Sequence, residues 1–273
     1  MKLDTSLAWH RAHGAVMANR DVLMVVGGVF FLLPRLVLAL LGPMPDLPVT
    51  PGMAPEQAAA LIQQAWLKLA PFALPVLLIE AAGTLSLVAL FADRSRPTVG
   101  QAIGQGLRAL LPYLLAQILF TAIASLLGMV VMGAAAASGV RLVQGIGLGL
   151  GLGGLIYGLL RMVLLVPVVV IEGRTSPAAA ITRAWALTRG NASAIGLFFC
   201  LAMLVMAVAV WAAVATLGLG ATLLGGAQAG QITGTVVEAV LGTVFSIYFA
   251  AVLASFHAQL AGREASGRRT PFD

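Results

Sequence analysis

VQGIGLGLGLGGLIYGLLRMVLLVPVVVI, residues 143–171, is the stretch that decides the class of fold. Arg161 is its only charged residue. A helix needs about twenty apolar residues to cross the roughly 30 Å of hydrocarbon in a bilayer. The stretch is longer than the apolar runs that soluble helices or strands carry, and it therefore predicts a transmembrane helix.

Apolar windows of similar length lie on both sides of this stretch. The 273 residues are 60% hydrophobic and 10% charged, whereas a soluble domain is about 45–50% apolar and about 25% charged. We expect an all-α, polytopic helical bundle with about six transmembrane helices, forming a single membrane domain over residues 1–273. The other windows are about 22–42, 69–91, 111–136, 193–218 and 232–258.

Lysine and arginine are unevenly divided between the two sides that six spans would create. Twelve fall on the side of the N-terminus, and two, Lys68 and Arg141, fall on the other side. Short cytoplasmic loops carry the excess of these residues, so both termini are expected in the cytoplasm. The twelve are Lys2, Arg11, Arg20, Arg94, Arg96, Arg108, Arg174, Arg183, Arg189, Arg263, Arg268 and Arg269.

Short amphipathic helices are expected within the stretches on the cytoplasmic side. The clearest begins at Ser176 and Pro177, a favourable N-cap followed by proline at the first helical position. Ala178, Ile181 and Trp185 then form an apolar stripe. Helices that are too short and polar to span, yet carry Trp and Arg, lie in the plane of the lipid headgroups. The expected ranges are about 4–19, 97–110 and 177–189.

Short surface helices are also expected in two other segments of the chain. Within 97–110, an apolar face is formed by Val99, Ile103, Leu107 and Leu110. The link on the opposite side, at about 43–68, begins with several prolines and then favours a surface helix from Glu56 onwards. A short surface helix is thus expected before the second and the third span.

Glycines recur in the first half of the quoted stretch, in rows whose members lie four positions apart. Small residues four positions apart allow a second helix to approach closely in lipid. A phosphate-binding loop is excluded, because no lysine or hydroxyl residue follows at the required spacing and no strand precedes. We expect close packing, with a tight hairpin to the preceding span around residues 138–141. The rows are Gly145, Gly149 and Gly153, and Gly147 and Gly151.

Four ionisable residues interrupt the apolar windows: Arg35, Glu80, Arg161 and Glu238. A charge at the centre of a membrane helix costs about 2.5–3.5 kcal/mol on insertion scales, so each needs compensation. Arg35 and Glu238 lie nearer the outer ends of their windows and can snorkel or pair there. Glu80 and Arg161 lie at similar depth with opposite sign, which predicts an ion pair between them. Such a pair would either fix helix positions or line a polar cavity.

Several function classes find no support in the sequence. No nucleophile elbow, His-Glu-x-x-His or paired aspartate motif is present, so catalysis is not favoured and no cofactor or metal is expected. His10 and His13 lie three apart without a third ligand nearby, which favours interfacial anchoring. Cys200 cannot form an internal disulfide and is expected to be buried filler. The net charge of +6 fits cytoplasmic loops at anionic lipid rather than nucleic acid.

The segment VPVVVIEGRTSPAAAITRAWALTRGN, residues 166–191, carries a family resemblance. It resembles the membrane domain of the glycerophosphoryl diester phosphodiesterase family and the related YciC-type bacterial inner-membrane proteins. The resemblance implies a corner between a span and a surface helix, in which Gly173 permits the turn and Glu172 caps amides or pairs with Arg174 or Arg183. Ala184 departs from the serine that is common there. The matching residues are Glu172, Gly173, Arg183, Trp185, Leu187, Thr188 and Gly190.

The resemblance limits what can be expected of function. In fused members the phosphodiesterase chemistry belongs to a separate soluble domain that this sequence lacks. We expect a non-catalytic protein of the bacterial inner membrane that binds or organises lipid or supports a partner envelope system. The alternative is a small transporter or permease for a lipid-derived or amphiphilic solute, and an intramembrane enzyme is the least favoured. Membrane lipids are the expected partners, with a membrane-protein partner or homo-oligomer possible.

Overall fold

The computed structural model describes residues 3–43, 53–92 and 98–267, and every regular element among them is a helix. This confirms the expected all-α fold. Residues cluster into two compact units. The first unit comprises Met1–Arg20, Thr84–Leu204 and Ile247–Asp273, and the second comprises Asp21–Gly83 and Val205–Ser246.

Five helical segments of the described chain are long and apolar enough to cross a membrane. The first covers all but the last residue of the window expected at about 22–42, and the next three each contain one expected window. The fifth is 71 residues long and contains the last two windows. The segments are Arg20–Leu41, Glu56–Ala92, Val99–Ala137, Arg141–Ile171 and Ala192–Gly262.

The N-terminal surface helix predicted at 4–19 is α1, Thr5–Ala18, and it begins where Asp4 accepts a hydrogen bond from the amide of Leu7. The next three elements form the first membrane-type segment, with Pro34 near its middle. Proline removes a ladder hydrogen bond, and the wider π-helical turn before it is a common way to absorb that loss. The elements are α2 (Arg20–Gly27), the π-helical η1 (Gly28–Leu32) and α3 (Leu33–Leu41).

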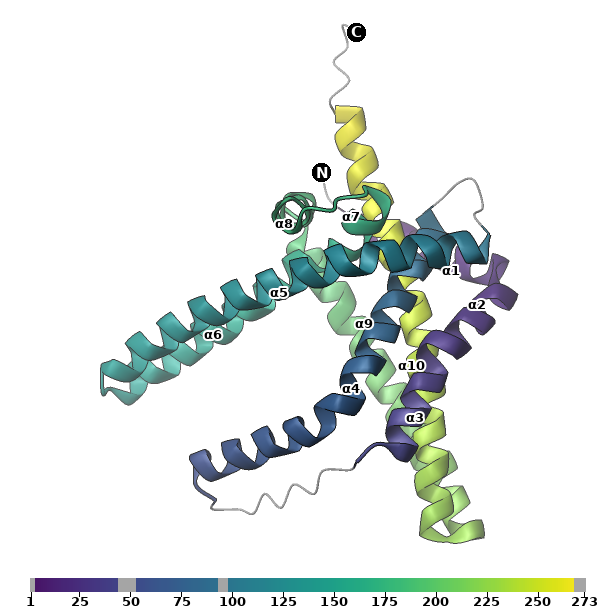
Figure 1. Cartoon of the computed structure of the whole chain (residues 1–273), viewed down its shortest axis with the longest axis horizontal. Coiled ribbons are helices and arrows are strands. Elements are labelled where there is room, and N and C mark those ends of the chain that lie inside the picture. Colours follow the sequence, from purple (N-terminus) through teal and green to yellow (C-terminus); the bar gives the residue numbers. More distant parts are fainter. Residues whose placement is uncertain (1–2, 44–52, 93–97, 268–273) are drawn as a thin grey trace, which may run out of the picture. The chain divides into compact units, whose positions relative to one another are not determined.

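Helices α4 (Pro55–Ala92) and α5 (Val99–Ala137) are each continuous, although the sequence suggested a surface helix followed by a span. The internal prolines do not end these helices, because a proline costs a long helix only a local hydrogen bond. Figure 1 shows the bend in α4. Residues 44–52, which include most of the proline-rich link, lie outside the described chain.

The first turns of α5 bury a different face from the one expected. Thr98 and Gln101 form a reciprocal capping box at its start. The buried residues are Ala102, Gly106 and Ala109, whereas Leu107 on the predicted aliphatic face is 53% exposed. Small side chains permit close contact with protein, so the larger aliphatic residues are left for lipid.

Helix α6 (Arg141–Met162) lies antiparallel beside α5 (Figure 1) and is followed by α7 (Leu165–Ile171). A Cβ on Gly147 would overlap the methyl group of Ala135, and one on Gly158 would lie 3.0 Å from the ring of Phe120. Within the predicted rows, the close approach is therefore observed at Gly147, whereas a Cβ on Gly151 would make only ordinary contact, 3.8 Å from Met132. The other row, Gly145, Gly149 and Gly153, has no neighbour within 4 Å of an added Cβ.

Helix α8, Pro177–Leu187, begins as predicted with Ser176 as N-cap. Its buried face is Ala180, Ala184 and Leu187 rather than the expected stripe that includes Trp185. Alanines allow α8 to lie close to its neighbours, and the larger indole is displaced to the side of the helix, where it is 37% exposed.

The last part of the chain is a helical hairpin made of α9 (Ala192–Ala213), the π-helical η2 (Val214–Gly218) and α10 (Leu219–Gly267). At Gly226 the backbone leaves the helical region, with φ 81° and ψ 177°. A Cβ on Gly234 would lie 3.3 Å from Val214, and one on Gly230 would meet Thr222. These contacts join residues that precede Gly226 to residues that follow it, so the chain reverses there (Figure 1).

Cys200 on α9 is exposed, not buried as expected. Its neighbour Phe199 is the buried residue of this turn, at 7% exposure. Successive residues of a helix point about 100° apart, so burial of one turns the next outwards.

Candidate functional site

The corner between α7 and α8 gathers the polar residues of the first unit. Glu172 follows directly after α7, and Gly173 adopts a left-handed φ of 64° that turns the chain away from the helix axis. Ser176 and Pro177 then start α8, which carries Arg183 back towards Glu172. The buried aliphatic residues of α7, among them Leu165 and Val168, hold this corner in place.

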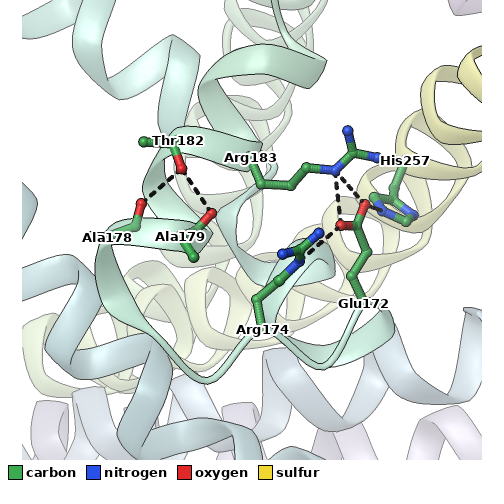
Figure 2. A network of polar contacts seen from close by, with 7 residues as sticks. All are labelled: Glu172, Arg174, Ala178, Ala179, Thr182, Arg183 and His257. Carbon is green, nitrogen blue, oxygen red and sulfur yellow. Dashed lines mark hydrogen bonds and ion pairs between the residues drawn. The ribbon is translucent and has the colours of Figure 1, made fainter.

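The carboxylate of Glu172 contacts two arginine side chains at this corner (Figure 2). The Nε of Arg183 donates to both oxygens of Glu172, at 2.8 and 3.0 Å. The Nε of Arg174 lies 3.7 Å from the same carboxylate, on a side chain that is 50% exposed. The pairing of Glu172 with Arg174 or Arg183 expected from the resemblance is thus observed for both arginines.

His257 from α10 completes the network and was not anticipated from the sequence. Its Nε2 lies 3.1 Å from Oε1 of Glu172, and its side chain is 6% exposed. An ionised carboxylate accepts only, so Nε2 carries the hydrogen in this contact. No local motif points to a partner 85 positions further along the chain.

The environment of Glu172 favours its ionised form. Burial raises the pKa of this carboxyl. The hydrogen bonds from Arg183 and His257, together with their charges, outweigh burial and leave the pKa of Glu172 below its ordinary value. The corner is therefore a fixed anion surrounded by donors, suited to holding elements together.

Arg161 lies elsewhere in the first unit, where it stacks on aromatic rings and forms no ion pair with a described residue. Its guanidinium carbon is 4.7 Å from the ring centroid of Trp185 and 5.6 Å from that of Tyr157. The residue is 5% exposed, and its Nε has no hydrogen-bond partner in the described chain. The hydroxyl of Thr188 donates to the Arg161 carbonyl at 3.3 Å. Trp185 thus has a role that its predicted place in a surface stripe did not suggest.

Glu80 has another partner than the one predicted. In the second unit, Nε of Arg35 donates to Oε1 of Glu80 at 2.6 Å, and Nη2 reaches Oε2 at 3.4 Å. Nη2 also donates to the hydroxyl of Ser246 at 2.9 Å. The predicted pair of Glu80 with Arg161 would join residues of the two units and stays a prediction, whereas the partner observed for Glu80 within the second unit is Arg35. The position of Glu80 within its apolar window and its negative charge are equally compatible with Arg35 as the partner. The sequence alone therefore could not choose between the two arginines.

Glu238, the fourth ionisable residue, forms no ion pair or hydrogen bond with any described residue. It faces a cavity of about 1010 Å³ that Arg35 also lines, which we call the Arg35–Glu238 cavity. The other walls of this cavity come from α3, α4, α9, η2 and α10 and are mainly apolar. The two charges share a cavity without pairing.

A second cavity, of about 480 Å³, lies in the first unit next to the corner, and we call it the basic cavity. Arg108 of α5 and Arg174 of the α7–α8 link face it, together with Gln105 and Thr175. The remaining wall is largely aliphatic, from Val169 to Ile171. No acidic side chain is among the described residues that line this cavity.

One of the two histidines of α1, His13, is part of an aromatic cluster. His13 Nδ1 lies 3.0 Å from the hydroxyl of Tyr248, and its ring stacks with Trp9 and Tyr248. Over residues 3–43, 53–92 and 98–267, no group of three or more His, Cys, Asp or Glu side chains is placed to hold a metal ion.

Of the residues that carry the resemblance, the structure joins Glu172, Gly173 and Arg183 at the corner, while Trp185 packs on Arg161 and Gly190 follows α8 with a left-handed φ of 78°. Compared with known proteins, the chain matches no family, no curated protein and no solved structure.

Proposed function

We propose that this protein is a non-catalytic membrane protein that binds an anionic lipid headgroup in the basic cavity. The observation that carries the proposal is that Arg108 and Arg174, from different elements, face one hollow that has no described acidic residue in its lining. Arginine pairs well with phosphate oxygens, because its planar donors match their geometry. Basic pockets between membrane helices are a recurring headgroup site.

The charge balance around the basic cavity favours an anion. Arg174 contacts Glu172 only at 3.7 Å, on a side chain that is 50% exposed, so its guanidinium can still face the cavity. Arg108 adds a second arginine to the same lining. The aliphatic wall from α7 suits the upper part of an acyl chain, while Gln105 and Thr175 offer further hydrogen bonds to a headgroup.

The proposed setting is the cytoplasmic face of a bacterial inner membrane, with both termini in the cytoplasm and six crossings. The division of twelve basic residues against two supports this orientation. The reversal at Gly226 supports six crossings, because it divides the longest apolar segment into two arms. With six crossings and the N-terminus inside, the basic cavity lies at the inner headgroups, where anionic lipid is concentrated.

We also propose a relationship to the membrane domain of the glycerophosphoryl diester phosphodiesterase family. The support is the corner motif, whose Glu172 and Arg183 pair across the turn that Gly173 makes. Only the membrane role is proposed, and no phosphodiesterase activity follows from it.

The test is native mass spectrometry of the protein released from nanodiscs of equal parts phosphatidylglycerol and phosphatidylcholine. Wild type should retain phosphatidylglycerol in preference to phosphatidylcholine. Arg108→Gln and Arg174→Gln should each lose most of that preference, because each removes one phosphate contact. Arg189→Gln, an exposed arginine outside the cavity, is the matched control and should retain it.

Equal retention of both lipids by all four proteins would contradict the proposal and leave these arginines as determinants of topology alone. Addition of inorganic phosphate separates a lipid site from a site for free phosphate. Only the latter would release its ligand at millimolar phosphate.

A second candidate function is transport of an amphiphilic solute. The observation in its favour is that the Arg35–Glu238 cavity, of about 1010 Å³, reaches Arg35 of the buried ion pair. Transport would appear as protein-dependent movement of a fluorescent amphiphile across a proteoliposome membrane, whereas a binding module would leave its distribution unchanged.

A further inference from the structure

We infer that the Arg35–Glu238 cavity binds an amphiphilic cation, with Glu238 as its counter-ion. The inference does not depend on the basic cavity, which lies in the other unit and is lined by other residues. It rests on the shape of the cavity, the charges that line it and the aromatic side chains on its wall.

The cavity has the size and lining of a small-molecule site. At about 1010 Å³ it lies at the upper end of the roughly 300–1000 Å³ common for ligand pockets. Leu38, Ala39, Met206 and Val210 make much of its wall apolar. A largely hydrophobic occupant with few polar groups fits such a lining.

Arg35 is already engaged and does not favour an anion. Its Nε and Nη2 bind Glu80 at 2.6 and 3.4 Å, and Nη2 also donates to Ser246. The Arg35–Glu80 pair is therefore neutral as a unit. An anionic ligand would have to compete with a carboxylate that is held at both oxygens.

Glu238 is the charge in this cavity that lacks compensation. It forms no hydrogen bond or ion pair with a described residue, although it lies on α10 one turn before Gly242, against which the Arg35 guanidinium packs. When Arg35, its partner Glu80 and Glu238 are counted together, their formal charge is −1. Glu238 is exposed rather than enclosed by the protein, so its carboxylate is open to a ligand, and a bound cation would supply the counter-ion that the described residues do not.

Aromatic side chains add to the attraction for a cation. Trp211 and Phe245 both line the cavity, and Trp211 is 75% exposed. The faces of aromatic rings attract ammonium and phosphonium groups, tryptophan most strongly. A ligand with a delocalised or substituted positive charge and an apolar body meets all these features at once.

The experiment uses the protein in phosphatidylcholine nanodiscs and the probe radiolabelled tetraphenylphosphonium, with empty nanodiscs as the background. Wild type should retain the probe above background. Glu238→Gln should weaken binding by at least about tenfold, because it removes the counter-ion while keeping the shape. Glu238→Asp should retain most of the binding. Unlabelled tetraphenylborate, of the same shape and opposite charge, should not compete.

Matched variants separate the site from nonspecific partitioning. Glu56→Gln changes an exposed glutamate outside the cavity and should bind as wild type. Trp211→Leu should weaken binding by about threefold to tenfold, whereas Trp66→Leu, an equally lipophilic change on α4, should not. Arg108→Gln in the basic cavity should also leave binding unchanged, so this inference and the proposed function fail separately.

Three results would overturn the inference. They are retention of the probe by wild type no greater than by empty nanodiscs, binding by Glu238→Gln equal to wild type, or competition by tetraphenylborate. Thermal unfolding of each variant in the same nanodiscs verifies that it is folded, and Glu238→Asp provides the charge-retaining comparison.

Discussion

At the scale of single residues, Glu172 is the side chain on which most other contacts of the corner depend. It binds Arg183 at both oxygens and also contacts Arg174 and His257. Glu172→Gln should lower the free energy of unfolding by about 1.5–3 kcal/mol, the usual range for hydrogen bonds to charged groups. Arg174→Gln should cost less than about 1 kcal/mol, because that pair is half exposed. Thermal and denaturant unfolding in detergent measure both, and equal losses would contradict this ranking.

The same residue sets a pH dependence. The folded pKa of Glu172 lies below its unfolded value, so ionisation stabilises the fold above the ordinary pKa of glutamate. That contribution is lost as pH falls through the unfolded and then the folded pKa. Arg174 and Arg183 stay charged throughout, and His257 is the other titratable group that faces Glu172. The difference in unfolding free energy between wild type and Glu172→Gln should be constant near pH 7–8, begin to shrink near the ordinary pKa of glutamate, and disappear only below the lowered pKa of the folded state.

Replacement of Arg161 should change the free energy of unfolding little, whereas removal of one partner of an ordinary buried ion pair is strongly destabilising. Its guanidinium has aromatic faces but no described carboxylate partner, and its Nε is unsatisfied. Replacement of a buried charge by an apolar residue of similar volume is often neutral or stabilising. Arg161→Met should therefore unfold within about 1 kcal/mol of wild type. Arg161→Lys should be less stable than either, since an ammonium group lacks the planar surface that stacks on Trp185. The order is read from unfolding midpoints, and a severe loss in Arg161→Met would show that the charge itself is needed.

At the scale of elements, the two glycine rows of α6 should differ in tolerance. A methyl group on Gly147 would overlap Ala135 of α5, whereas one on Gly149 meets nothing within 4 Å. Gly147→Ala should cost about 1–3 kcal/mol by overpacking. Gly149→Ala should be neutral or stabilising by up to about 1 kcal/mol, because alanine favours a helix. Unfolding of the pair in one detergent compares them directly, and equal effects would contradict the hairpin packing.

The reversal in α10 depends on glycine in a different way. At φ 81° and ψ 177°, Gly226 occupies a region that is essentially restricted to glycine. Gly226→Ala should destabilise the hairpin by about 1–3 kcal/mol. Gly220→Ala, with open space around its Cβ and no positive φ, is the control. Limited proteolysis between residues 219 and 231 should increase only in the Gly226 variant.

The sequence was sufficient to predict the long helices but not where they join or which faces they bury. The apolar windows located every long helix, because length and lack of charge are sufficient signals for membrane-type helices. The joins between elements were harder: residues 99–110 continue into α5 and residues 56–69 into α4, since neither segment carries a residue that forces a stop. Buried faces were also missed, because helices pack on small residues such as Ala102 and Ala180 whereas the sequence drew attention to larger ones.

At the scale of the whole molecule, the proposed six crossings give a direct labelling prediction. In a Cys200→Ser background, Val140→Cys and Ala227→Cys should react with a membrane-impermeant maleimide added outside intact cells. Ala178→Cys should react only after the membrane is opened. A chain with five crossings would place the two ends of the protein on opposite sides, and tags at both termini then would not share protection from external protease.

Pairing between distant segments was the part that sequence could not supply. Depth and sign are compatible with either arginine as the partner of Glu80, and only the three-dimensional arrangement selects Arg35. His257 has no motif around it that points to Glu172. The corner residues were found because their partners lie close in sequence, 11 positions apart for Glu172 and Arg183.

The contact between the two ends of the chain has a consequence for biosynthesis. The amide of Asp4 donates to Gln259 at 3.3 Å, and Gln259 returns a bond to the Asp4 carbonyl at 3.0 Å, across 255 positions. Leu3 similarly donates to Asn191 at 2.8 Å. Helix α1 is translated before these partners, and about 255 further residues must follow before Gln259 can meet Asp4. The final docking of α1 is therefore a late event in the synthesis of these residues.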